Sequence, residues 1–470
     1  MALIGSEKVS SASLSIFQRV VAFFTRILAA DHNDSRLTQL IAGNVFAVRT
    51  ASALLALASQ VLLARWMGSF EFGIYIYVWT WVLMIGALSD VGLSSATRRF
   101  IPEYSENKSF ERLRGFITGS RWLAFTIAAT IGILGALAVS IFNPWLSHFT
   151  IIPLYLACFA IPIYGLVQVQ AGIAQSYDWP NLALMPFYIW RQLIITALVG
   201  LVWLIGAPAD AVTAMAIAVA TTWAVTIVQS SLLSRRLRDK VPPGGKIFEP
   251  KVWFSTSLPI FVVEAFYLLL TYVDIIALEQ LSSPHDVASY YAGARLIGVV
   301  AFVYFAIANA AAHRFTEYHV SGDRRRLADF FSETVRWTFW PSFVACAVIL
   351  GFGRPLLSLF GNGFESGYDV MFILAIGLLA RAAVGPAERL LNMLGERKQC
   401  TIVYGTAFTI NLVLCTVLIP RFGIEGAAIA TSTALAVESA MFYSVAKRRL
   451  GLHIFVVGRR DAGLASGPLS

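Results

Sequence analysis

Charged residues are scarce in this chain of 470 amino acids. Only 13% are Asp, Glu, Lys or Arg, whereas 57% are hydrophobic, and a soluble domain usually has about 25% charged residues. This deficit excludes an ordinary soluble fold and indicates that lipid covers much of the surface. The net charge of +9 does not indicate nucleic-acid binding, because the basic residues lie in loops between apolar runs and there set membrane topology.

Cysteine is also rare, and the sequence has none of the common catalytic motifs. The four cysteines form no CxxC pair, and the six histidines do not cluster at the spacing of metal ligands, which argues against a disulfide framework or a zinc site. The chain has no nucleotide-binding glycine loop and no nucleophile elbow. We therefore expect no enzyme and no cofactor, and leave open a coupling to protons or sodium ions.

What the sequence does contain is a repeated run of about 20 apolar residues, the length of helix that crosses the hydrocarbon core of a bilayer. We predict an all-α polytopic membrane protein with about twelve transmembrane helices. The predicted spans are residues 41–64, 73–96, 116–142, 150–175, 182–206, 210–233, 252–281, 287–311, 332–353, 367–391, 400–419 and 423–446.

The loops alternate in charge. Those after spans 2, 6, 8 and 10 are rich in Lys and Arg, whereas those after odd-numbered spans hold only Arg65, Arg354 and Arg421. Basic loops stay in the cytoplasm, so this bias predicts a multi-pass protein with both termini in the cytoplasm. The outer loops are short, and we expect no external domain.

The chain divides into two similar halves. Tyr75 precedes Arg99 by the same 24 residues that separate Tyr290 from Arg314, which indicates a parallel repeat of the kind found in transporters. We predict an interfacial amphipathic segment over 1–40, an N-terminal lobe of six helices over 41–233, a cytoplasmic linker over 234–251, a second six-helix lobe over 252–446 and a cytoplasmic tail over 447–470.

Arginine residues lie within the apolar spans, where charge is costly. Arg121 and Arg336 are near the span ends and can reach the lipid headgroups. The deeper ones are Arg49, Arg191, Arg295 and Arg381. They either form structural ion pairs or line a cationic cavity that binds a phosphate-bearing substrate, for which the planar guanidinium is well suited.

Acidic residues in the spans are candidates for ion coupling or for counter-ions to these arginines. Glu264 is the deepest, with Pro259 one turn before it, and Asp274 lies two to three turns further along the same span. Asp90 is closer to a span end and fits a helix cap or a gate contact. The aromatic residues around Trp79 predict an interfacial belt on the outer side.

Three segments of the sequence resemble the polysaccharide flippases of the multidrug/oligosaccharidyl-lipid/polysaccharide exporter superfamily. They are Ala64–Tyr75 continuing to Asp90–Leu93 and Arg98–Phe100, Ser257–Pro259 through Asp274 to Tyr290 and Ala292, and Gly395, Asn411 and Ile419–Ala430. The resemblance extends over nearly the whole chain from residue 41.

This resemblance implies a V-shaped pair of six-helix lobes that flips an undecaprenyl-pyrophosphate-linked oligosaccharide across the bacterial cytoplasmic (inner) membrane by alternating access, for exopolysaccharide, capsule or O-antigen assembly. The implied partners are the lipid-linked oligosaccharide, membrane lipids and the polymerase and glycosyltransferases of that assembly. The alternatives are a cation-coupled exporter of drugs or metabolites, a membrane enzyme of polysaccharide assembly and a non-transporting scaffold.

Overall fold

The computed structural model describes residues 34–321, 324–450 and 455–456, and every regular element within them is helical. The elements are α2 (Asp34–Leu88), α3 (Leu93–Glu106), α4 (Phe110–Phe142), η1 (Asn143–Trp145), α5 (His148–Ser176), α6 (Pro180–Met185), η2 (Pro186–Trp190), α7 (Arg191–Leu204), α8 (Ala211–Arg238), α9 (Pro250–Leu281), α10 (Pro284–Ile297), η3 (Gly298–Val300), α11 (Ala301–Val320), α12 (Arg324–Gly351), α13 (Gly353–Ser358), α14 (Gly367–Val384), α15 (Ala387–Met393) and α16 (Arg397–Leu450).

Ten helices of the described chain are long and apolar enough to cross a membrane. Backbone polar groups find no water in a bilayer, so a spanning segment must satisfy them within a helix. Two of the ten, at 59 and 53 residues, are longer than one crossing needs, and each contains a glycine with non-helical dihedral angles, Gly68 and Gly423. The predicted all-helical membrane fold is confirmed, while the number of twelve crossings stays a prediction.

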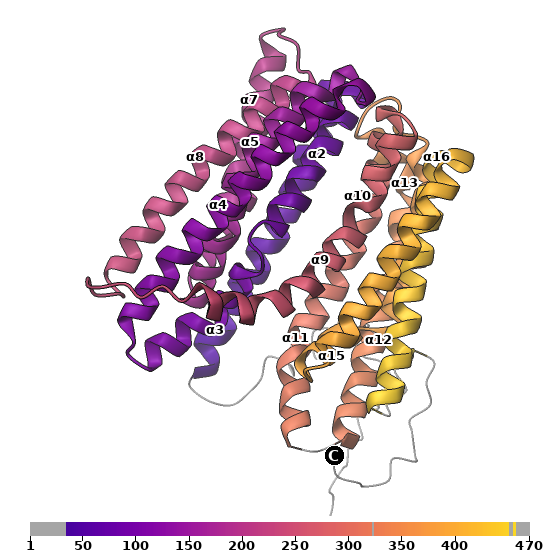
Figure 1. Ribbon diagram of the computed structural model, residues 1–470. Helices are drawn as coiled ribbons and strands as arrows, with labels where there is room; N and C mark the ends of the chain where they lie inside the picture. Colours follow the sequence, from indigo (N-terminus) through magenta and orange to yellow (C-terminus); the bar gives the residue numbers. More distant parts are fainter. Residues whose placement is uncertain (1–33, 322–323, 451–454, 457–470) are drawn as a thin grey trace, which may run out of the picture.

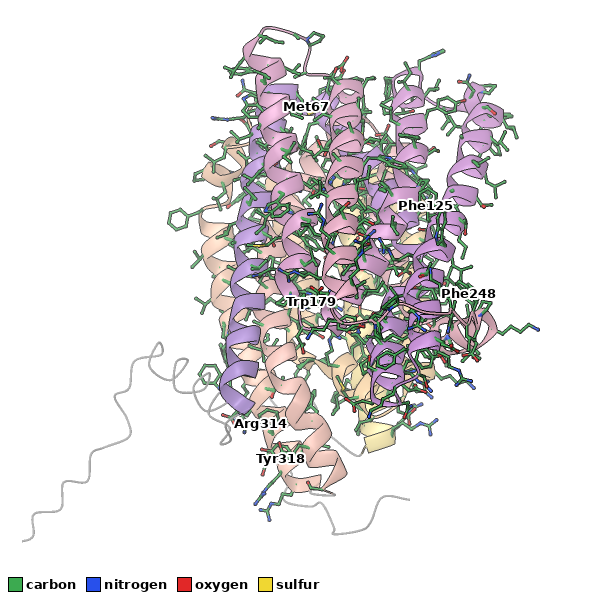
Figure 2. All side chains as sticks on the ribbon, turned by 90° about the vertical axis from the view of Figure 1, so that its left-hand side faces the viewer. Met67, Phe125, Trp179, Phe248, Arg314 and Tyr318 are labelled. Carbon is green, nitrogen blue, oxygen red and sulfur yellow. The ribbon has the colours of Figure 1, made fainter. Side chains whose placement is uncertain are left out.

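The helices run between two ends of the molecule (Figure 1). We call one the turn end, because it contains Gly68, whose positive φ of 78° favours glycine. The other is the linker end, after the connection between α8 and α9. Figure 2 shows Met67 near the turn end and Arg314 and Tyr318 near the linker end.

Within the described residues, the two halves of the chain share a large core at the turn end. One cluster of buried apolar side chains there joins α2, α5, α7 and α8 to α9, α10, α14 and α16. Two further cores lie toward the linker end: one is built from α2 to α6, α8 and Trp253 of α9, the other from the rest of α9, α11, α12 and α14 to α16. The halves are therefore joined by a continuous core at one end, whereas toward the other end they have separate cores that α9 connects; Figure 1 shows the two halves side by side.

The connection between the halves is fastened to the first of them. Arg114 donates hydrogen bonds to the carbonyl oxygens of Gly245 (2.7 Å) and Pro242 (2.8 Å). Trp253, in the first turn of α9, is buried in the linker-end core of the first half, against Phe116. The start of α9 thus packs on one half and its continuation on the other, across the helix-weakening Pro259.

Parts of the predicted terminal segments lie outside the described residues. Of the predicted interfacial segment 1–40, only residues 34–40 are described, and they form the start of α2. Of the predicted tail 447–470, residues 447–450 complete α16, and 455–456 follow. The boundaries of the two predicted six-helix lobes stay predictions.

Candidate functional site

A pocket of about 430 Å³ lies between the two halves of the chain. α2 forms one wall, and α10, η3, α11 and α12 form the other. Leu54 and Phe302, on opposite walls, are both exposed, so the pocket is open to its surroundings. The lining residues are Thr50, Ala53, Leu54, Leu57, Ala294, Arg295, Gly298, Val299, Phe302, Val303, Ala306, Ile307, Trp337 and Pro341.

Arg295 is the one charged residue among those that line this pocket. It lies 11 residues after the start of α10 at Pro284, or about 16 Å from the turn end at 1.5 Å per residue, near the middle of a hydrocarbon core of about 30 Å. Its side chain is exposed, and no carboxylate of the described residues forms an ion pair with it. A cation in this position is available to an anionic ligand.

Arg191 is buried in the first half and is held by aromatic rings. Its guanidinium carbon lies 4.2 Å from the ring centre of Trp79 and 4.9 Å from that of Phe187, and its Nε donates a 2.9 Å hydrogen bond to Thr222. Cations over aromatic faces gain electrostatic energy, more so when desolvated. The charge of Arg191 is therefore stabilised without a carboxylate.

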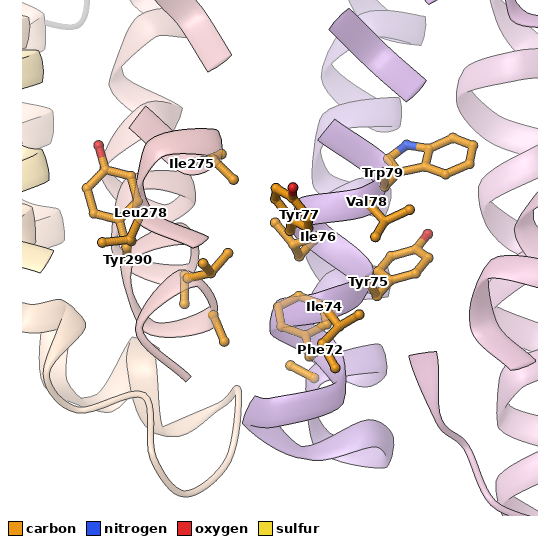
Figure 3. Close-up of a cluster of buried hydrophobic side chains, with 14 of the residues drawn as sticks. Phe72, Ile74, Tyr75, Ile76, Tyr77, Val78, Trp79, Ile275, Leu278 and Tyr290 are labelled. Atoms are coloured by element: carbon orange, nitrogen blue, oxygen red, sulfur yellow. The ribbon is translucent and has the colours of Figure 1, made fainter. Parts of the chain in front are cut away.

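The aromatic residues that hold Arg191 do not form the predicted interfacial belt. Tyr75, Tyr77 and Trp79 are 5%, 2% and 8% exposed, because α2 is surrounded by protein at this level. Figure 3 shows Tyr75 and Trp79 pointing away from Ile275 of α9, and Tyr77 on the side nearer to it. The belt prediction is wrong for these residues, which pack inside the bundle.

Arg49 lies on the exposed surface of α2. Both Arg49 and Arg191 act electrostatically on the hydroxyl of Tyr188, which η2 presents just before Arg191. Tyr272 of α9 lies near both Tyr188 and Arg295. Phenol groups of both halves thus lie in the neighbourhood of three of the four predicted arginines.

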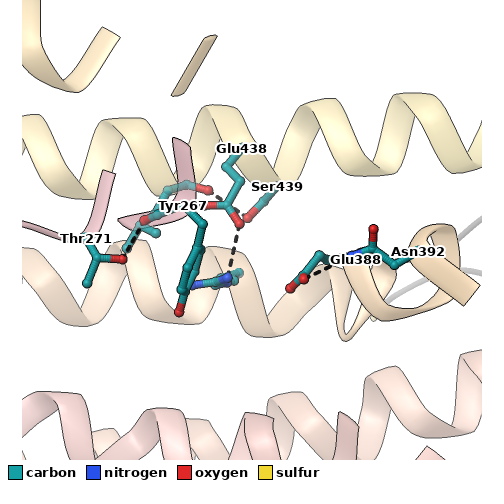
Figure 4. A network of polar contacts seen from close by, with 8 residues as sticks. Tyr267, Thr271, Glu388, Asn392, Glu438 and Ser439 are labelled. Carbon is teal, nitrogen blue, oxygen red and sulfur yellow. Dashed lines mark hydrogen bonds and ion pairs between the residues drawn. The ribbon is translucent and has the colours of Figure 1, made fainter. Parts of the chain in front are cut away.

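Arg381 is the arginine with a carboxylate partner. Its Nη2 lies 3.4 Å from Oε1 of Glu438, whose side chain is 2% exposed, and its guanidinium lies over the rings of Tyr304 and Tyr267 at 5.2 and 5.9 Å. Figure 4 shows Glu438 and Tyr267 in this network and, beside it, the 3.2 Å hydrogen bond from Asn392 to Glu388. Tyr267 also lies near Tyr272 of the same helix.

Glu264 and Asp90 lie where α3 meets α9. Glu264 accepts a 2.7 Å hydrogen bond from Ser95 of α3, which also receives one from Arg98 at 3.3 Å. Asp90 accepts from the backbone N–H groups of Gly92 (2.9 Å) and Ser94 (3.1 Å), the geometry of a helix cap. Glu264 therefore joins the two halves toward the linker end, and Asp90 organises the start of α3.

Asp274 is buried within the second half and is surrounded by hydroxyl groups. It accepts hydrogen bonds from Tyr290 of α10 at 2.6 Å and from Thr431 of α16 at 3.2 Å, and from the backbone N–H of Ile275 at 2.8 Å. No cationic side chain of the described residues pairs with it. This carboxylate can take up a proton or, with its hydroxyl neighbours, an oxygen-preferring cation.

Sequence reasoning missed two features, the buried carboxylate of Glu279 and the Gln60–Tyr291 pair. Glu279 lies within a predicted span, is 9% exposed, and its Oε2 has no hydrogen-bond partner in the described structure; its position inside that span was the available signal. Tyr291 accepts a 2.6 Å hydrogen bond from Gln60 of α2. Nothing in the sequence marks this pair, because the two residues are 231 positions apart.

Two protein-family models match the sequence of this chain. The sequence model of the polysaccharide biosynthesis protein family matches residues 43–318, and that of the MatE family matches residues 259–417. No curated protein matches the chain significantly.

Solved structures with the same fold are transporters. A multidrug resistance MATE family transporter of the MOP superfamily, in an inward-facing conformation, is similar with a TM-score of 0.69 and 14% identity, over 85% of this chain and 94% of that one. The lipid II flippase MurJ, in an inward closed conformation, has a TM-score of 0.67 and 17% identity, over 86% of this chain and 87% of that one. A MOP superfamily transporter from Pyrococcus furiosus is similar with a TM-score of 0.64 and 15% sequence identity, over 91% of this chain and 97% of that one. At these identities the likeness concerns the fold.

Proposed function

Because this chain belongs to the polysaccharide biosynthesis protein family, we propose that it is a flippase that moves an undecaprenyl-pyrophosphate-linked oligosaccharide across the bacterial cytoplasmic membrane by alternating access. The product serves exopolysaccharide, capsule or O-antigen assembly. Its partners are this lipid-linked oligosaccharide, the surrounding membrane lipids, and the polymerase and glycosyltransferases that use and make it.

The observation that carries the proposal is the pocket with Arg295. Its apolar walls suit an isoprenoid chain, and its single charged residue is a cation near the middle of the span. A phosphate taken into a bilayer without a partner has a desolvation penalty of many kcal/mol, and a guanidinium can offset it with two parallel hydrogen bonds. One amphipathic pocket thus accepts both parts of the substrate.

The other predicted arginines have graded roles in this proposal. Arg49, which is exposed and, like Arg191, lies near the Tyr188 hydroxyl, is the proposed second contact for the pyrophosphate. Arg191 keeps its charge between Trp79 and Phe187 and adds to the positive potential of the first half rather than binding the substrate first. The charge of Arg381 is balanced by Glu438, so in this proposal Arg381 forms a structural ion pair.

Orientation follows from the loops. The basic connection between α8 and α9 is placed in the cytoplasm, with both termini, so the linker end faces inward and the turn end outward. With the shared core at the turn end, the described arrangement corresponds to a state closed toward the outside. Asp274 is the proposed site where a proton or a sodium ion couples to transport, and Glu264 the contact that closes the linker end.

A second candidate function is export of drugs or metabolites, favoured by the MatE match over residues 259–417 and by the apolar walls of the pocket. An organic cation, however, would be repelled by Arg295. The ligand's charge therefore separates the two candidates.

The test is binding of undecaprenyl pyrophosphate and of undecaprenol to the purified protein, measured by native mass spectrometry. We expect the wild type to prefer the diphosphate, Arg295→Ala to lose that preference, and Arg295→Lys to retain part of it, because charge returns without the planar fork. Arg99→Ala, an exposed arginine outside the pocket, is the control. Equal binding of both lipids by the wild type, or tighter binding of organic cations, would reject the flippase proposal.

A further inference from the structure

A hydrogen bond between the two halves lies next to the pocket. Gln60 Nε2 of α2 donates to the hydroxyl oxygen of Tyr291 of α10 at 2.6 Å. Thr50, Ala53 and Leu57 line the pocket at helical spacing, and Gln60 continues their stripe by one turn. Tyr291 lies one turn before Arg295 on α10. The pair therefore borders the pocket on the side of the turn end.

Beyond this pair the two halves are tightly packed. The ring of Tyr291 packs edge-on against Phe72 of α2, at 6.2 Å between centres, and Phe72 packs in the same manner on Phe364. A Cβ on the next residue, Gly73, would come within 1.9 Å of the Pro284 carbonyl oxygen. The Gln60–Tyr291 hydrogen bond thus lies between the open pocket and the tightly packed contact of the two halves at the turn end.

The chemistry of the pair suits an anionic ligand at Arg295. Residues four apart on a helix share a face, and Arg295 acts electrostatically on the Tyr291 hydroxyl. The hydroxyl oxygen already accepts a hydrogen bond from Gln60, so its proton is free to be donated. Gln60 Oε1 is buried without a partner, and that oxygen does not compete for the phenol proton in the described arrangement.

Resting on the proposed function, we propose that Tyr291 and Arg295 bind the same anionic group of the lipid-linked substrate, and that Gln60 is the positioning residue that orients the Tyr291 hydroxyl toward it. A phenol that donates to an anion becomes a better acceptor, since linked hydrogen bonds polarise one another. A diphosphate in the pocket therefore strengthens the Gln60–Tyr291 bond and holds the two halves together at the turn end.

The chain contains a matched control for this inference. Gln280 of α9 donates a 2.8 Å hydrogen bond to the hydroxyl of Tyr77 of α2, a second glutamine–tyrosine bond across the two halves. Neither residue lines the pocket. Tyr77→Phe thus removes a bond between the halves without removing a donor from the neighbourhood of Arg295.

The experiment compares binding of undecaprenyl pyrophosphate and undecaprenol by native mass spectrometry for the wild type, Tyr291→Phe and Tyr77→Phe. Thermal unfolding first establishes that each variant is folded. A hydrogen bond to a charged group contributes about 1.5–3 kcal/mol, so Tyr291→Phe should weaken diphosphate binding about tenfold or more and leave undecaprenol unaffected. Tyr77→Phe should bind both lipids as the wild type does.

Substitutions of Gln60 separate orientation from packing. Gln60→Met keeps the size and removes the donor, and we expect a smaller loss of diphosphate binding than in Tyr291→Phe. Gln60→Glu would accept the hydrogen bond of the Tyr291 hydroxyl and add a negative charge beside the pocket, and we expect the largest loss of diphosphate binding. If Gln60 only fills space, Gln60→Met and Gln60→Glu should have equal effects. Unchanged diphosphate preference in Tyr291→Phe overturns this inference alone, whereas a wild type without that preference overturns the proposed function and the inference with it.

Discussion

At the scale of single residues, the two halves stabilise a buried arginine by different means. Arg191 is enclosed by aromatic faces and Thr222, whereas Arg381 has the carboxylate of Glu438 as well as two tyrosine rings. A buried charge without compensation would be expelled or neutralised. Within the described residues, Glu438 is the one negative charge paired with Arg381, and a substitution can remove it.

Replacing Glu438 by Ala should destabilise the protein strongly. Removing one partner of a buried ion pair leaves an uncompensated charge and costs about 3–5 kcal/mol. Thermal unfolding of the purified protein in detergent measures the effect. Glu103→Ala is the control, because its pair with Arg99 is exposed and contributes less than about 1 kcal/mol. Similar melting temperatures for the two variants would mean that Arg381 does not need Glu438.

Asp274→Asn should uncouple transport from the ion gradient. The amide keeps an oxygen that can accept from Tyr290 and Thr431, but it can neither take up a proton nor supply a charge to a cation. Transport of the lipid-linked saccharide in proteoliposomes, measured with imposed proton or sodium gradients, should then be insensitive to both. Glu425→Gln, at an exposed site on α16, should keep the wild-type response. A gradient response that survives in Asp274→Asn would exclude this carboxylate as the coupling site.

At the scale of elements, the closed turn end depends on how closely α2 approaches the start of α10. Gly73 has no side chain, and this lets the Pro284 carbonyl lie where a Cβ would otherwise be. Close-packed helices in membranes use small residues for the same reason. The hydrogen bond between Ser69 and His285, at 2.7 Å, lies at the same contact.

Gly73→Ala should therefore open the turn end. The added methyl group would meet the Pro284 carbonyl oxygen at 1.9 Å, so the two halves must move apart to accept it. Spin labels at Leu204→Cys and Ser366→Cys, one in each half, report the separation by pulsed electron resonance, and we expect a longer distance in the variant. Gly351→Ala is the control, since nothing lies within 4 Å of its Cβ. Identical distance distributions in all three proteins would show that this contact does not set the closure.

At the scale of the whole molecule, the distribution of cores defines which end can open. The core at the turn end is continuous across both halves, while the two cores toward the linker end are connected through α9, whose Trp253 lies in the core of the first half. Separating the halves at the linker end therefore exposes little apolar core. Separating them at the turn end would instead divide the core that both halves share. If the protein works by the proposed alternating access, the apolar contacts between the halves at the turn end must be replaced by new contacts elsewhere.

The orientation in the membrane can be tested directly. Cysteine at Lys240, in the basic connection, should be labelled by a membrane-impermeant maleimide only after the cells are opened, because basic loops stay inside. Cysteine at Ser366, exposed near the start of α14, should be labelled in intact cells. A variant with all four native cysteines replaced is the background. Labelling of both positions from the same side would contradict the predicted orientation.

Much of the fold follows from the sequence alone. The scarcity of charge, the length of the apolar runs and the bias of the loops predict membrane helices, and these are confirmed by the ten long apolar helices of the described chain. These features are local, because the bilayer acts on each segment separately. Asp90 as a helix cap is predictable for the same reason, since its partners Gly92 and Ser94 are its neighbours in sequence.

The sequence by itself determined that this chain crosses the membrane many times and that cations such as Arg295 lie far from the ends of its apolar runs. Only the tertiary structure decided that Arg191 faces Trp79, that Arg381 pairs with Glu438, and that Arg295 remains open to a pocket. The physical reason is distance along the chain. The cost of burying a charged side chain depends on its depth in the span, and the sequence of that span is enough to estimate it. The partner that offsets this cost lies on another helix, whose position is set by packing.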